Sequence, residues 1–163
     1  MELTTEEQRL CLDIRRLHLE SNYSYRVNLL VNLLDRRMGN NQICCPYKEK
    51  DGSKSVDEIV VYVLEQGEDL MKKRCAEISQ LLLTALTLLQ RLEREGYITT
   101  KDSPLKDFPE ISCGAGTPST CLKKEVITDS TILELINEYL PKEIFITEKF
   151  ESLCSSFDLS LRQ

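Results

Sequence analysis

The stretch from Ile78 to Leu92 constrains the fold of this chain more than any other feature. Its spacing is helical, but a two-stranded coiled-coil seam needs only about two apolar residues in seven. A helix here must therefore bury more than one face, either inside its own chain or against a partner. Nine of the fifteen residues are apolar: Ile78, Leu81, Leu82, Leu83, Ala85, Leu86, Leu88, Leu89 and Leu92.

Capping signals and apolar periodicity predict a first long helix over about residues 5–38. Thr4 and Glu7 match a capping box at its start. The phase of the apolar residues shifts near residues 20–22, which predicts a kink, a stutter or a short break. Gly39 suits the left-handed position that commonly follows a helix.

A second long helix is predicted over about residues 55–95. Ser55 and Glu58 match another capping box, and Gly96 followed by Tyr97 matches a Schellman ending. The apolar seam of this helix alternates steps of three and four, as in a coiled coil. The residues before it, 39–54, are rich in turn-forming residues and are expected to form a loop.

The remaining chain divides into two parts by composition. Residues 98–128 contain Pro, Gly, Ser and Thr and are expected to be a flexible linker. Within this linker, Ser103 and Thr117 each precede a proline, as in proline-directed phosphorylation sites. Residues 129–163 are expected to form one or two short helices, for which Asp129, Ser130 or Thr131 could supply the cap.

These elements together predict an all-α protein. Its core would be a long antiparallel, coiled-coil-like helical hairpin within residues 1–97. The short C-terminal helices could fold back on it to give a three- or four-helix bundle. Six residues are placed at the centre of the core or of a partner interface: Leu81, Leu82, Leu86, Leu88, Leu89 and Leu92.

Residue chemistry does not favour catalysis or metal binding. His18 is the single histidine, and the six glycines are scattered, so neither a His-dependent triad nor a phosphate-binding loop is indicated. Cys44 and Cys45 are adjacent, and Cys113 and Cys121 are eight residues apart, which is not the spacing of a structural zinc site. The sequence predicts no catalytic residue, no metal ligand and no cofactor, and the thiols are expected to be reduced.

The charge balance and the hydropathy narrow the location and the partners. Twenty-seven acidic residues against 21 basic ones give a formal charge of −6, which makes nucleic acid an improbable partner. No apolar run is long enough to span a membrane, and the N-terminus does not resemble a secretory signal. A cytoplasmic or nuclear protein, or one found in both, is expected.

The function predicted from the sequence is that of a non-catalytic helical subunit or adaptor in an intracellular complex. It would bind protein partners through helix two, and also through the C-terminal helices if these remain free. The alternative is a small helical-bundle enzyme or a cysteine-based metal or redox protein. Stoichiometric metal in the purified protein would favour that alternative.

Overall fold

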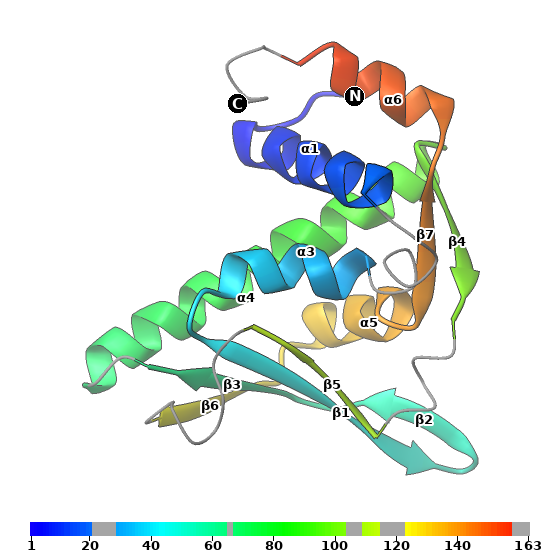
Figure 1. Ribbon diagram of the computed structural model, residues 1–163. Coiled ribbons are helices and arrows are strands. Elements are labelled where there is room, and N and C mark those ends of the chain that lie inside the picture. The colour runs from blue at the N-terminus through cyan, green and yellow to red at the C-terminus, as the bar shows by residue number, and fades with distance from the viewer. Residues whose placement is uncertain (21–28, 65–66, 104–108, 115–122, 158–163) are drawn as a thin grey trace.

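The chain folds into a mixed helix and sheet structure rather than the all-α bundle that was expected. The computed structural model describes residues 1–20, 29–64, 67–103, 109–114 and 123–157 (Figure 1). Within these residues, two antiparallel sheets accompany the helices. The prediction of an all-α, coiled-coil-like hairpin is therefore wrong.

The helices keep much of the predicted N-terminal organisation. The Thr4 and Glu7 capping box is present, and the first helix ends at Leu19, next to the predicted break. Gly96 has a φ of 80°, and the Tyr97 amide donates to the Leu92 carbonyl over 2.8 Å, as the Schellman ending requires. The described helices are α1 (Thr5–Leu19), α3 (Leu29–Met38), α4 (Glu68–Arg94), α5 (Ser130–Tyr139) and α6 (Glu148–Ser155).

Strands occupy three regions where helix or loop was expected. The region between α3 and α4 holds three of them, and the expected linker 98–128 contributes another three. The strands are β1 (Gln42–Lys50), β2 (Ser53–Val56), β3 (Ile59–Val63), β4 (Ile98–Asp102), β5 (Glu110–Cys113), β6 (Lys123–Ile127) and β7 (Lys142–Ile146).

Local chemistry explains why the region before α4 is extended. Asp51 and Gly52 both have positive φ, 52° and 80°, and they join Lys50 to its partner Ser53. That is the geometry of a two-residue hairpin turn, for which Asp-Gly is among the best sequences. The run Ile59–Val63 is β-branched or aromatic throughout, and such residues favour a pleated, packed surface over a helix.

The predicted second helix is therefore shorter than expected. It starts at Glu68, and the expected capping box of Ser55 and Glu58 does not form. Ser55 lies in β2, where it pairs with Lys48. In the last third of the chain the Asp129 carboxylate, one of the three proposed caps, accepts from the Ile132 amide over 3.0 Å.

The larger sheet is built around β1. The strand order is β2–β1–β3–β6, and β5 pairs with β1 from the other side. Figure 1 shows α3, α4 and α5 on one face of this sheet, and no described helix lies on the other face. The smaller sheet pairs β4 with β7, next to the C-terminal end of α4.

Segments far apart in the sequence meet at α1. Its Cys11 carbonyl lies 3.9 Å from the Cys154 thiol of α6, and both cysteines are fully buried. Arg15 pairs with Glu151 of α6 over 2.6 Å. Through these contacts the C-terminal helix packs on the N-terminal one, as Figure 1 shows.

One side chain from the helical layer completes the edge of β2. Asn137 of α5 accepts from the Val56 amide over 2.8 Å, and its own amide group donates to the Val56 carbonyl over 2.9 Å. The side-chain amide thus replaces a neighbouring strand at this position. Buried backbone groups need such partners, because leaving one unpaired costs about 1–3 kcal/mol.

Asn137→Leu is therefore expected to lower the free energy of unfolding by about 1–3 kcal/mol, because it leaves both Val56 backbone groups without this partner. Urea denaturation followed by circular dichroism would measure the change. Glu134→Gln, at an exposed position on the same helix, is the control and should stay within about 0.5 kcal/mol. Equal stability of the Leu variant and the wild-type protein would contradict this role.

Candidate protein-binding surface

The leucines proposed as core or interface lie almost entirely inside the protein. Leu82, Leu86 and Leu89 are fully buried, and Leu88 and Leu92 are at most 1% exposed. Leu81 is half-buried at the rim of the core. The sheet covers one side of α4, while α1 and α5 contact others. The expected need to bury more than one face of α4 is thus met within the chain.

The face of the larger sheet that the helices leave uncovered is the most extended candidate. Residues alternate along each strand, so the helices cover Ile43, Ile59, Val61 and their neighbours. The residues between them point away from α3, α4 and α5. We call this surface the open face; it consists of Gln42, Cys44, Pro46, Val60, Tyr62, Glu110, Ser112, Lys124 and Val126.

The strand register arranges these residues in rows across the sheet. Cys44, Val60 and Val126 stand side by side on β1, β3 and β6. Val60 is half-buried, whereas Val126 at the sheet edge is 44% exposed. The next row holds Gln42, Tyr62 and Lys124. Apolar side chains thus form the middle of the open face, with polar and charged groups around them.

A thiol and a carboxylate meet on this face. The Cys44 Sγ lies 3.2 Å from an oxygen of Glu110, and Ser112 stands opposite Cys44 on β5. Burial, followed by the Glu110 hydrogen bond, raises the pKa of the Cys44 thiol. A thiol held in its protonated form is a poor nucleophile and a poor metal ligand. The pair therefore serves packing and hydrogen bonding better than chemistry.

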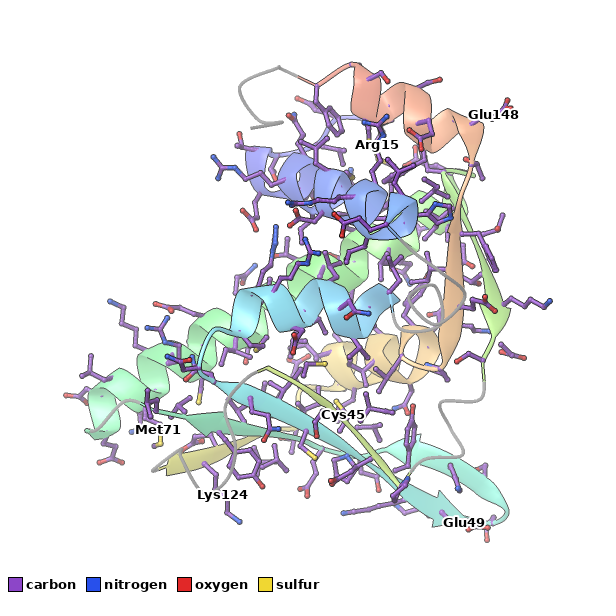
Figure 2. The ribbon with its side chains drawn as sticks, in the orientation of Figure 1. Arg15, Cys45, Glu49, Met71, Lys124 and Glu148 are labelled. Carbon is purple, nitrogen blue, oxygen red and sulfur yellow. The ribbon has the colours of Figure 1, made fainter. Side chains whose placement is uncertain are left out.

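The other cysteines of the core are similarly protected. Burial is the largest cause that raises the pKa of Cys11, Cys45 and Cys113, the last to about 12. Cys45 and Cys113 lie on the neighbouring strands β1 and β5, and both are buried. Figure 2 labels Cys45 on β1. Among the described residues, no three metal-binding side chains come together. Cys121 lies outside the described residues.

A shallow groove beside α4 is a second candidate surface. It encloses about 380 Å³ between the turn after α3 and the N-terminal half of α4. Arg74 and Glu77 pair with each other along one side. Leu64 is 43% exposed at its edge, and Leu70 is 56% exposed in a smaller hollow nearby. Unlike the middle of the open face, the groove is lined in part by charged side chains, namely Arg37, Arg74 and Glu77.

One of the two proposed phosphorylation sites, Ser103, lies in the described part of the chain. Ser103 follows β4, is half-buried, and its amide donates to the Pro141 carbonyl over 2.9 Å. Thr117 lies outside the described residues. Modification of Ser103 stays a prediction.

Comparisons with family models, with curated proteins and with solved structures give no match to this chain. No described helix combines the length and the apolar character that crossing a membrane would require. The function must therefore be inferred from the surface itself. Sequence reasoning missed the open face because it did not predict the strands, although the β-branched run in β3 was the available signal.

Proposed function

We propose that this protein is a non-catalytic subunit or adaptor that binds another protein through the open face of its larger sheet. The observation that carries the proposal is the apolar row Cys44, Val60 and Val126, which no described helix covers and whose exposure rises from 8% at Cys44 to 44% at Val126. A sheet in a small domain normally buries at least one face, and a second apolar face without cover is typical of an interaction site.

The burial of the leucines supports this assignment of the surface. Leu82 and Leu86 are fully buried, so α4 does not offer its leucine face to a coiled-coil partner in this state of the chain. Among the described residues no helix covers the open face, so Val126, which is 44% exposed, can be reached without rearrangement of them. Most pre-organised interfaces bind with little backbone movement. We therefore propose contacts through a sheet surface, in the cytoplasm, the nucleus or both, rather than through helix two.

The alternative of a cysteine-based enzyme or redox protein receives no specific support. The raised pKa of Cys44 and Cys113 disfavours the thiolate form that nucleophilic and redox chemistry requires. Stoichiometric zinc or iron in the purified protein would support this alternative.

Val126→Asp is expected to abolish stoichiometric recovery of the partner from cells while leaving the fold intact. Val126 is 44% exposed, so the change adds little strain to the monomer but places a charge in the apolar row. Affinity purification with quantitative mass spectrometry would measure partner recovery, and circular dichroism would check the fold.

Leu70→Asp is the matched control for this experiment. Leu70 is 56% exposed on α4, away from the open face, and its replacement should leave partner recovery unchanged. Loss of the partner with Leu70→Asp and retention with Val126→Asp would move the binding surface to the groove beside α4. If both variants recovered as much partner as the wild-type protein, the proposal would lose its basis.

A further inference from the structure

The edge of the larger sheet at β6 adds a second feature to the open face. Within the described residues, β6 pairs with β3 on one side, and the strand order ends there. The backbone groups that point outward from an edge strand can accept a further strand. Natural edge strands are usually blunted by proline, by a bulge or by several charges. Three of the five residues of β6 are charged, Lys123, Lys124 and Glu125, so the charge pattern limits which strand can pair there, while Val126 stays 44% exposed.

The side chains at this edge define what a further strand should carry. Lys124 and Val126 both point to the open face, beside Tyr62 and Val60 respectively. Lys124 is exposed and forms no ion pair within the described part of the chain. An added strand would place one residue opposite Val126 and another, two positions away, opposite Lys124. Opposite charges and apolar pairs stabilise such cross-strand positions, so an apolar residue and an acidic residue fit best.

A second copy of this chain fits the edge less well. Two β6 strands that overlap fully in antiparallel order would pair Glu125 with its own counterpart, because Glu125 is the middle residue of the strand. Like charges directly opposite each other are destabilising. Lys124 would then face Val126 of the other copy, which leaves the lysine without an acidic partner. The charges thus favour a different protein over self-association.

We infer that β6 accepts an extended segment of the partner protein as an additional antiparallel strand, with an apolar residue beside Val126 and an acidic residue beside Lys124. This inference rests on the proposed function and adds that the partner binds through an extended segment of its chain. The backbone hydrogen bonds supply affinity, and the alternating side chains supply selectivity, as in other cases of strand addition. The antiparallel direction continues the pattern of every pairing in this sheet.

A charge-swap experiment tests the assignment. The probe is the capped peptide Val-Val-Thr-Glu-Thr, whose glutamate would face Lys124, and its counterpart Val-Val-Thr-Lys-Thr carries the opposite charge. Wild-type protein is expected to bind the glutamate peptide about fivefold more tightly, and Lys124→Glu is expected to reverse that preference. Lys48→Glu, an exposed lysine on β1, is the control and should keep the wild-type preference. Amide chemical shifts of β6 at millimolar peptide would report the binding.

Three results would overturn the inference. The first is no shift of the β6 amides with either peptide. The second is a preference that does not change with Lys124→Glu. The third is a dimer of this chain that Lys124→Glu abolishes, because the edge would then belong to self-association. If the cellular partner is lost with Val126→Asp but kept with Lys124→Glu, the proposed function stands and only the strand-addition mode fails.

Discussion

Replacing Leu88 by aspartate is expected to unfold the protein. Leu88 is 1% exposed in the C-terminal half of α4, a helix that contacts α1, α5 and strands of both sheets. Aspartate would put an unpaired carboxylate into this apolar environment and would also remove most of the leucine's packing. The burial of an uncompensated charge exceeds what a domain of marginal stability tolerates. Far-UV circular dichroism should show loss of both helix and sheet.

Two milder variants calibrate this result. Leu88→Ala should lower the free energy of unfolding by about 2–5 kcal/mol, because it leaves a cavity in a well-packed core. Lys72→Ala, on the exposed side of the same helix, should stay within about 0.5 kcal/mol. If Leu88→Asp instead remained helical and monomeric while losing a partner, the leucines of α4 would form an interface rather than a core.

Replacing Gly114 by alanine is also expected to cause a large loss of stability. Its φ is +105°, and a Cβ built there would lie 2.1 Å from the backbone oxygen of Asn41, a contact that real side chains do not make. The Gly114 amide also donates to the Asp35 carboxylate over 2.6 Å, so the backbone is held in place. Gly114→Ala should therefore lower the free energy of unfolding by about 3–5 kcal/mol.

Gly39→Ala separates steric conflict from backbone preference. Gly39 also has a positive φ, +58°, but nothing lies within 4 Å of its hypothetical Cβ. The alanine there should cost about 1–2 kcal/mol, which is the usual penalty of a left-handed conformation. Thermal unfolding of both variants would measure the difference. Similar losses at the two glycines would show that the loop around Asn41 yields easily.

Local signals made the start of α1 and the end of α4 predictable. Thr4 with Glu7 caps α1, and Gly96 with Tyr97 ends α4, because these motifs act within a few residues. The prediction that the leucine-rich helix needs cover on more than one side also agrees with its burial. What covers it could not be derived, because the cover comes from strands distant in the sequence.

The strands escaped prediction for an identifiable reason. Ser55 and Glu58 match a capping box, which predicts a helix that would include the residues of β3. The stronger signals were the Asp51-Gly52 dipeptide and the unbroken β-branched run after it. The strands β5 and β6 are short and lie far in the chain from their partners β1 and β3, so their pairing depends on tertiary contacts that no local pattern encodes.

The candidate surface was unpredictable for the same reason. Cys44, Val60 and Val126 become neighbours only through the register of three strands. In the sequence they are an ordinary cysteine and two ordinary valines, without spacing that distinguishes them. The exposure of Val126 likewise depends on β6 being the last strand of the sheet among the described residues. Surfaces of this kind follow from topology, and they can be recognised only when the topology is known.

The contact of α1 with α6 has a consequence for synthesis on the ribosome. Arg15 meets Glu151 across 136 residues of sequence, and Cys11 meets Cys154 across 143. At about 5–20 residues per second, the first helix waits on the order of 7–27 s for its last neighbour to be made. During that interval its apolar side has no final cover and is open to chaperones. Helix α1, although it is synthesised before α6, is therefore among the last elements to reach its native environment.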